Sequence, residues 1–379
     1  MITTRERVTL AELWSGVRQP TSALTECFRG LLPLDGRQCV FTNQGKAAFE
    51  QIVLAAGLAN SRIIVPAFFP DDFVGLYRKY SMTPVFVDVD PETYQLDLGA
   101  VRPEHLAGAK SMLLLHTFGL PADGRTYRRF CDEHGLVLIE DCARALGAAY
   151  RNELAGSFGH YALFSLPKCT PVREGGIAIA ERPMRPALEP ARLGMYGLLH
   201  ALTLVKWPFV EPIESAIYAR VADTPVYPRE VGIYDPRPGR ELDAFGQAVL
   251  RGYMPHYRAA VDAKRRLANH FRQALCSRGF KFQHNHGGHV YTAVAIDPPP
   301  AVDSDRFQAF LHRNGVKVSA MWRGALGMTE LAAREWGADP EATPVARRLS
   351  TRLLQLPVNR FQTPGQTEKI VRLCEQFSS

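Results

Sequence analysis

Two stretches of the chain decide how it folds: LVLIEDCARALGAAY at residues 136–150 and SFGHYALFSLPKCTPVREGGIAIA at residues 157–180. In each, a short apolar run of the kind that forms a buried strand gives way to polar residues. The first run closes with Glu140 and Asp141, and the second is followed by Lys168. Two acids and a lysine are therefore predicted at the ends of two strands.

The sequence around these stretches alternates short apolar runs with helical patterns. The predicted strands are Arg62–Pro66, Thr83–Val89, Ser111–His116, Leu136–Glu140 and Tyr161–Ser165. The predicted helices between them are Gly45–Leu58, Asp71–Tyr80 and Ala122–His134. This alternation predicts an α/β fold with a mainly parallel sheet. Ligands bind such sheets at the carboxyl ends of the strands, which is where the acids and the lysine are expected.

The chain from about residue 240 onward combines helices with a few short strands. A long amphipathic helix that can be interrupted is predicted first, followed by strands His289–Ile296 and Val316–Ser319 and helices Asp303–Asn314 and Thr367–Phe377. At 379 residues the chain is long enough for two cores. We expect residues 1–235 to form a large α/β domain and residues 236–379 a smaller C-terminal α+β domain.

An apolar and proline-rich segment, residues 184–234, stands between these two parts as an insertion or connector. A membrane-spanning helix needs about 20 uninterrupted apolar residues, whereas Lys206, Pro208 and Glu211 break the apolar run here. We therefore favour a core or dimer-interface helix. Contact of residues 193–213 with a membrane surface or a lipid-linked substrate is the alternative.

Composition narrows the partners and the compartment. A formal net charge of +7 suits an anionic substrate or a phosphate cofactor, and its even distribution argues against nucleic acid. Seven scattered cysteines, none in a CxxC pair, are typical of reduced thiols and give no zinc pattern. The charged N-terminal sequence is unlike a signal peptide, so a cytoplasmic location is expected.

The acids and the lysine suggest chemistry with a carbonyl cofactor. A partly buried lysine among apolar neighbours can form an imine, and an acid at a strand end can keep a pyridine nitrogen protonated. Glu140 and Asp141 could equally cap the next turn, and Lys168 could be an ordinary surface lysine. A third segment, FTNQGKAAFEQIVLAAG, opens a helix at Gly45 with Lys46 in its first turn, an arrangement that suits a phosphate.

Taken together, these segments resemble the DegT/DnrJ/EryC1/StrS family of PLP-dependent (sugar) aminotransferases, which have fold type I. The resemblance runs from about residue 40 to the end. It is carried by VLIEDCARALGA and by GSFG…FS…K…GG, and supported by IIVPAFF with TPVFVDVDPETYQLD, by LLLHTFGLPAD and by LLQLPVNRFQTPGQTEKIVRLCEQF. It implies a large domain with a mainly parallel seven-stranded sheet and a small C-terminal α+β domain. No metal is implied.

The resemblance also implies roles for individual residues. Lys168 would hold pyridoxal 5'-phosphate (PLP) as a Schiff base and move protons, and Asp141 would bind its pyridine nitrogen. The other expected cofactor contacts are Ser165, Gly45 and Lys46 at the phosphate, Arg144 at the phenolic oxygen, and Phe69 or Phe68 stacked on the ring. The chain departs from the family at Gln44-Gly45-Lys46, which replaces a Ser-Gly-Thr turn, and in a shorter interval between Ser165 and Lys168.

A few other residues carry weaker signals. His116 closes a strand and could approach the cofactor, or could only satisfy backbone groups. Trp322 and Arg323 fall where the family forms the substrate entrance, with a surface position as the alternative. The histidines of KFQHNHGGHVY, at 284, 286 and 289, suggest a metal tract, but a polar turn is the better interpretation because no Cys or acid joins them.

The activity that the resemblance implies is transamination in a homodimer. The amino donor is expected to be glutamate, and the acceptor a keto-sugar, most simply a nucleotide-linked one. Two alternatives stay open: a PLP enzyme with a non-sugar or lipid-linked acceptor, and a non-catalytic relative with a binding or regulatory role. Retention of Lys168 argues against the family's sugar dehydratases, in which histidine replaces this lysine.

Overall fold

The computed structural model describes all residues except 1, 5, 192–238, 321 and 379. Residues 193–213, which were considered for membrane or lipid contact, lie outside the described part of the chain. So does the predicted domain boundary at residue 235, and the division of the chain at that point stays a prediction.

The large sheet has seven strands in the order β1-β9-β8-β5-β4-β2-β3. Their bounds are β1 Gln38–Thr42, β2 Arg62–Pro66, β3 Thr83–Val87, β4 Ala109–Leu115, β5 Val137–Asp141, β8 Tyr161–Ser165 and β9 Gly176–Ala180. β9 is antiparallel to both of its neighbours, and the pairs from β8 to β3 are parallel. The predicted mainly parallel sheet is confirmed, and two of its strands have the predicted bounds.

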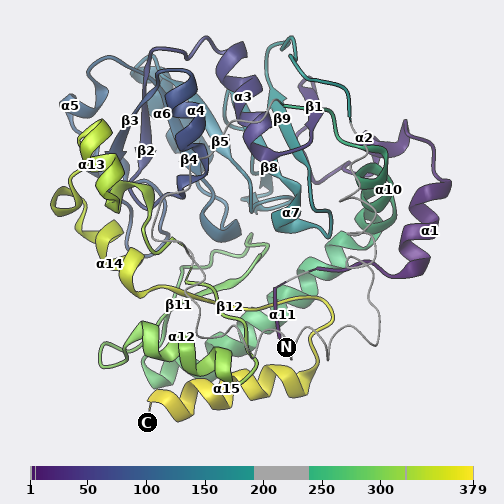
Figure 1. The fold of residues 1–379 in the computed structure, drawn as a ribbon, viewed down its shortest axis with the longest axis vertical. Coiled ribbons are helices and arrows are strands. Elements are labelled where there is room, and N and C mark those ends of the chain that lie inside the picture. The colour runs from purple at the N-terminus through teal and green to yellow at the C-terminus, as the bar shows by residue number, and fades with distance from the viewer. Residues whose placement is uncertain (1, 5, 192–238, 321, 379) are drawn as a thin grey trace.

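Helices cover both faces of this sheet (Figure 1). The helices that follow one strand and precede the next along the chain are α3 (Gly45–Ala55), α4 (Val74–Lys79), α5 (Pro103–Leu106), α6 (Gly124–Glu133) and α7 (Leu166–Cys169). The others are α1 (Leu10–Arg18), α2 (Ala23–Glu26), α10 (Ala244–Tyr253), α11 (Tyr257–Leu275), α12 (Ser304–Arg313), α13 (Glu330–Trp336), α14 (Pro344–Arg352) and α15 (Pro364–Ser378). The predicted long helix after residue 240 is interrupted at Met254–His256, a 3-10 turn that contains Pro255.

The small domain has a three-stranded antiparallel sheet, β10 (Lys281–Phe282), β11 (Val294–Asp297) and β12 (Leu354–Leu356), packed against α11, α12 and α15 (Figure 1). Two strand predictions were wrong here. The run from His289 to Ala293 is not a strand, since Tyr291 has a positive φ of 45° and the strand begins at Val294. Val316–Ser319 forms only isolated bridges, to Ile2 and Gln355.

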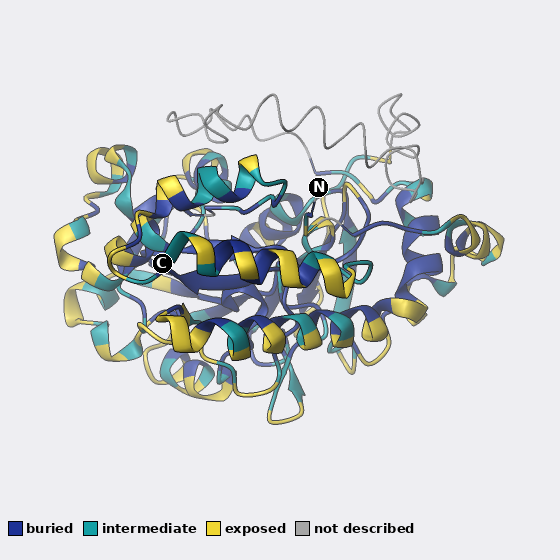
Figure 2. Ribbon diagram, turned by 90° about the horizontal axis from the view of Figure 1, so that it is seen from below, coloured by how far each residue is buried: buried dark blue, intermediate teal, exposed yellow. Residues whose placement is uncertain are grey.

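The strands of the large sheet are mostly buried, and exposed residues gather on the outer sides of the helices (Figure 2). One apolar cluster joins the sheet to residues late in the chain, including Trp322, Leu326 and Leu349. A second cluster joins the sheet to α10 and to the start of α11, with Val249 and Tyr257 among its members. Elements from the second half of the chain thus help to bury the large sheet, and hold its strand ends in place.

Candidate active site

A cavity of about 290 Å³ lies at the carboxyl ends of the parallel strands. Segments that follow β1, β2, β5 and β8, and the loop that precedes antiparallel β9, all reach this edge of the sheet. The lining residues are Asn43, Gln44, Gly45, Lys46, Pro70, Asp72, Phe73, Asp141, Ala143, Leu163, Ser165, Pro167, Lys168, Arg173, Glu174 and Gly175. The cavity therefore contains five of the seven residues that were predicted to contact the cofactor.

The predicted acid and lysine lie in this one cavity although they are far apart in the sequence. Asp141 is the last residue of β5 and is 3% exposed, and its Oδ1 accepts a hydrogen bond from the Ala143 N–H at 2.9 Å. Burial raises the pKa of Asp141, and the charge of Lys168 acts in the opposite direction. A cationic N–H group that enters the cavity would therefore stabilise the charged form of this buried carboxylate.

Lys168 sits in the short helix α7, which begins directly after Ser165 at the end of β8. Its Nζ lies 3.2 Å from Oδ2 of Asp72, and the side chain of Lys168 is 31% exposed. Pro167 and Leu163 line the cavity beside it. The amine is thus accessible from the cavity and has apolar neighbours, as its predicted role requires.

The other end of the cavity is built from the start of α3. Gln44 is the N-cap of this helix and makes no side-chain capping bond, so the first backbone N–H groups point out of the helix end. A Cβ on Gly45 would lie 2.9 Å from Cβ of Ser165. The short distance shows that Gly45 and Ser165 pack directly against each other and form one surface, so a larger residue at position 45 would displace Ser165.

Among the described lining residues the aromatic one is Phe73, which was not a predicted cofactor contact. Its ring packs against Phe49 at a centroid distance of 4.2 Å and 17° between planes, and against Phe69 at 5.6 Å. Phe69 is fully buried and does not occur among the described lining residues. Arg144 does not occur there either, and its Nη1 donates to Oγ1 of Thr292 at 2.9 Å. Their contacts with a cofactor stay predictions.

Glu140 faces away from its neighbour Asp141, as successive residues of a strand do. Its carboxylate accepts hydrogen bonds from the backbone N–H groups of residues 156, 158 and 159 at 2.9, 2.7 and 2.5 Å. Burial opposes its charge, but the hydrogen bond from His116 and those from the backbone hold the pKa of Glu140 below its ordinary value. Glu140 therefore holds the turn at residues 156–159, whereas the sequence had suggested the turn that directly follows its strand.

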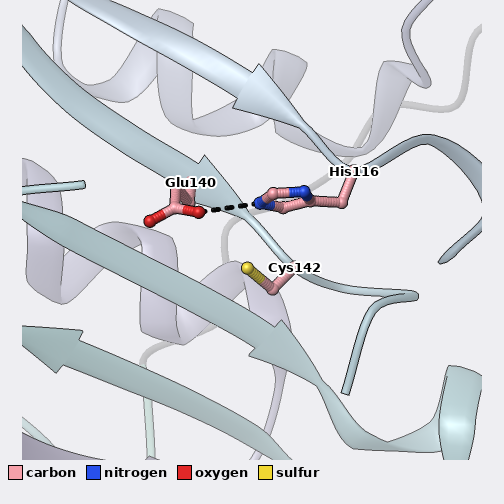
Figure 3. A group of neighbouring side chains, drawn as sticks. All are labelled: His116, Glu140 and Cys142. Atoms are coloured by element: carbon pink, nitrogen blue, oxygen red, sulfur yellow. Dashed lines mark hydrogen bonds and ion pairs between the residues drawn. The ribbon is translucent and has the colours of Figure 1, made fainter. Parts of the chain in front are cut away.

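His116, Glu140 and Cys142 form a buried group that has the residue types of a metal site (Figure 3). Nδ1 of His116 accepts the Ala122 N–H at 3.0 Å, so the proton is on Nε2, which donates to Glu140 at 2.8 Å. Burial raises the pKa of the Cys142 thiol well above its ordinary value, which disfavours the thiolate that a metal needs. We assign this group a structural role: it connects β4, β5 and the turn at 156–159.

The remaining predicted residues lie elsewhere. Trp322 is 8% exposed and stacks on Phe118 at 4.8 Å, so it is a core residue. Arg323 is ion-paired with Asp305. His289, one of the three histidines of the suggested metal tract, is buried and stacks on Tyr291 at a centroid distance of 3.7 Å, so it packs as a core residue. All seven cysteines are free thiols, as predicted.

Comparisons with known proteins agree with this geometry. The solved structure of a DegT DnrJ EryC1 StrS aminotransferase from Brucella abortus superposes with a TM-score of 0.73 at 21% identity, over 97% of this chain and 95% of that one. This likeness shows the fold. With its mainly parallel seven-stranded sheet and small α+β domain, the chain has the fold of the fold type I PLP-dependent transferases, as predicted.

Sequence relatives point to one family. The DegT/DnrJ/EryC1/StrS aminotransferase family matches residues 32–183. An L-glutamine:2-deoxy-scyllo-inosose aminotransferase of Streptomyces kanamyceticus is 33% identical over 149 residues, which are 38% of this chain and 35% of that protein. A UDP-N-acetyl-3-dehydro-alpha-D-glucosamine 3-aminotransferase of Acidithiobacillus ferrooxidans is 25% identical over 356 residues, or 86% of each chain. Residues 32–183, which contain the acid and the lysine, are thus similar to the DegT/DnrJ/EryC1/StrS aminotransferase family, and the predicted resemblance is confirmed for this segment.

The match to the Streptomyces relative spans only about a third of that protein's length. The family relationship therefore rests on the segment that contains the acid and the lysine. Among the helices that the structure describes, none is both long and apolar enough to cross a membrane.

The residues of the cavity fit PLP. The amine of Lys168 suits the aldehyde of PLP, and the buried carboxylate of Asp141 suits its ring nitrogen. The surface of Gly45 and Ser165 at the start of α3 offers backbone N–H groups and a hydroxyl to a phosphate. Lys46 lines the same cavity and would supply positive charge where Gln44-Gly45-Lys46 lacks the hydroxyls of a Ser-Gly-Thr turn.

Proposed function

We propose that this chain is a PLP-dependent aminotransferase that moves an amino group from an amino acid to a keto-sugar. The observation that carries the proposal is the meeting of Lys168 and Asp141 in one cavity, from the ends of β8 and β5. The family supports the reaction type, and the Acidithiobacillus relative, named for a UDP-linked keto-sugar, supports a nucleotide-linked acceptor.

PLP, when bound, supplies an aldehyde for the amine and a ring that accepts electrons. Asp141 would hold a proton on the ring nitrogen, and this contact would offset the cost of burying the carboxylate. Lys168 Nζ would carry the proton that leaves and returns at the substrate carbon, because its amine is partly exposed in the cavity that also contains Asp141. Lys46 and Arg173 bring positive charge to the cavity and would attract an anionic acceptor.

The test is the visible spectrum of the purified protein loaded with PLP. We expect a band from the lysine-linked cofactor, which borohydride fixes to Lys168 and which fades when the amino donor is added. Glutamate and glutamine should be compared, because glutamate is the donor we expect and the Streptomyces relative is named for L-glutamine. In Lys168→Ala the band and turnover should disappear while the circular dichroism stays unchanged. A protein that stays colourless with PLP would support a non-catalytic, binding or regulatory role instead.

A second acceptor class is favoured by one observation. The Streptomyces relative is named for 2-deoxy-scyllo-inosose, a cyclic ketone without a nucleotide. A panel of nucleotide-linked keto-sugars, free keto-cyclitols and small keto acids separates the two acceptor classes. Each compound is added after the amino donor has removed the visible band, and return of the band identifies an acceptor. Turnover with the cyclitols alone would contradict the nucleotide-sugar assignment.

We also propose a homodimer in the cytoplasm. Leu10, Trp14 and Val17 on α1 are 57%, 60% and 57% exposed and follow each other at helical spacing, so they form an apolar stripe. Such stripes on a folded surface are typical of subunit contacts. Sedimentation analysis tests the assembly, and a monomer at micromolar concentration would contradict it.

A further inference from the structure

Arg173 lies in the loop of residues 166–175, which also contains Lys168. A hydrogen bond from the Leu166 N–H to the Gly175 carbonyl oxygen, at 3.0 Å, closes this loop at its base. The side chains of Arg173 and Lys168 both line the cavity. One closed loop therefore brings an amine and a guanidinium to the same small space.

The backbone just before Arg173 is anchored in the core. Val172 is 4% exposed and belongs to the apolar cluster that joins the sheet to α10 and the start of α11. Thr170 donates its N–H and its hydroxyl to the Leu166 carbonyl oxygen at 2.8 and 2.9 Å. Arg173 itself is exposed although it lines the cavity, which places its side chain at the cavity's opening.

Three of the described residues that line the cavity are cationic, and the proposed contacts with PLP use two of them. Lys46 lies at the start of α3, where the phosphate is expected, and Lys168 is the proposed reacting amine. Arg173 is the third, and the cofactor does not require it. An arginine stays charged at any physiological pH, and its planar fork binds a carboxylate through two parallel hydrogen bonds.

The two substrates of the proposed reaction carry their anionic groups at different distances from the reacting carbon. In an amino acid the carboxylate is bonded directly to the carbon that loses its proton. In a nucleotide-linked keto-sugar the phosphates are attached to the anomeric carbon and are separated from the keto carbon by other ring atoms, and a keto-cyclitol has no phosphate. An arginine that shares a loop and a cavity of about 290 Å³ with the reacting lysine is placed for the nearer anion.

We propose that Arg173 determines specificity for the amino donor by binding its α-carboxylate while the donor's amino group faces Lys168. The proposal rests on the proposed function, because only an aminotransferase takes an amino donor at this cavity. Oδ2 of Asp72 lies 3.2 Å from Lys168 Nζ, and its negative charge disfavours a carboxylate on that side of the lysine. The side of Arg173 is the favourable one.

The experiment follows the two half-reactions separately through the visible band of the PLP-loaded protein. In Arg173→Gln, the donor concentration that gives half the maximal rate of band loss should rise about tenfold, the low end for a lost hydrogen bond between charged groups because Arg173 is exposed. Return of the band on addition of the acceptor should keep its concentration dependence. Arg173→Lys keeps the charge without the fork and should recover part of the donor affinity.

A donor analogue shows whether the α-carboxylate is the group that Arg173 contacts. The 1-amide of the same amino acid keeps the amino group and the side chain but has no α-carboxylate. The unaltered chain should need about tenfold more of the 1-amide than of the acid, whereas Arg173→Gln should not distinguish the two compounds. Arg182→Gln is the matched control and should behave like the unaltered chain, because exposed Arg182 lies just after Ala180, which pairs with Tyr161 at the edge of the sheet opposite the cavity.

Chemical modification of the unaltered chain provides a second measurement in case Arg173→Gln does not fold. Phenylglyoxal modifies accessible guanidinium groups, and peptide mass spectrometry reports Arg173 and Arg182 separately. The α-methyl form of the donor has no α-hydrogen to lose and so stays in the cavity unconverted. It should protect Arg173 in the PLP-loaded protein and leave Arg182 reactive, and the 1-amide of the same compound should protect neither.

Four results would overturn the proposal for Arg173. They are an unchanged donor dependence in Arg173→Gln, an equal loss for the acid and its 1-amide, a loss confined to the acceptor half-reaction, and equal protection of Arg173 by the α-methyl donor and its 1-amide. Each can occur while the unaltered chain forms its visible band and loses it to the donor, so the proposed function would stand. Absence of the band from the unaltered chain contradicts the proposed function instead.

Discussion

Replacement of Glu140 by glutamine tests how strongly the turn at 156–159 is held against β5. Each carboxylate oxygen of Glu140 accepts two hydrogen bonds, one oxygen from the N–H groups of Phe158 and Gly159 and the other from Gly156 and His116. Glutamine retains one acceptor oxygen, and its amide nitrogen would face the two donors on the other side. Two charge-assisted hydrogen bonds would be lost.

Such bonds contribute about 1.5–3 kcal/mol each, which gives a loss of about 3–6 kcal/mol for the two. Neutral glutamine is less costly to bury than a carboxylate, so we expect a value near the lower end, about 3 kcal/mol. The measurement is urea unfolding at neutral pH with an unchanged denaturant slope. Glu368→Gln, at an exposed ion pair, is the control and should cost less than about 0.5 kcal/mol.

The pH dependence provides a second check on Glu140. Because its folded-state pKa lies below the ordinary value of 4.5, the carboxylate stabilises the fold fully above that pH. The stabilisation is lost as the pH falls through the lower folded-state pKa, so the difference in stability between the unaltered chain and Glu140→Gln should shrink on acidification below about 4.5. A loss below about 1 kcal/mol at neutral pH, or a difference that grows in acid, would refute the reasoning.

Two more substitutions test the cavity and the core. Asp141→Asn should weaken PLP binding and slow turnover by several orders of magnitude, since a neutral amide does not hold the ring nitrogen protonated; near-normal rates in a standard coupled assay would remove Asp141 from the site. Trp322→Ala should cost about 3–5 kcal/mol in urea unfolding, because its ring stacks on Phe118 and is edge-on to Phe68 at 5.1 Å. A loss of acceptor affinity without a loss of stability would favour the substrate entrance predicted for Trp322.

The five parallel strands of the large sheet were predictable because their apolar runs are bounded by clear breaks, whereas antiparallel β9 was not among the predicted strands. β2 and β8 have the predicted bounds, and the end of β8 indicated where Ser165 and Lys168 would lie. The small domain was harder, since the apolar run after His289 contains Tyr291 with a positive φ. Local periodicity carries no signal for such a backbone conformation.

The contacts that the sequence did not reveal depend on tertiary structure. Asp72 meets Lys168 across 96 positions, and only the parallel arrangement of β2 and β8 in one sheet places them at the same edge. Phe73 follows an Asp-Asp pair and has the local appearance of a loop residue. The aspartates themselves could have been a signal, since two acids a few residues after a buried strand are similar to the pattern that drew attention to Glu140 and Asp141.

The position of β9 between β8 and β1 bears on how the loop that contains Lys168 can vary. Gly176 is in register with Ser165 on one side and with Thr42 on the other. The loop of residues 166–175 therefore begins after Ser165 and ends before Gly176, two residues that are paired in the sheet. Shortening or lengthening that loop would move the lysine without rebuilding the surface at Gly45. The unusually short step from Ser165 to Lys168 can therefore be tolerated, and the loop is a natural unit for exchange between homologues.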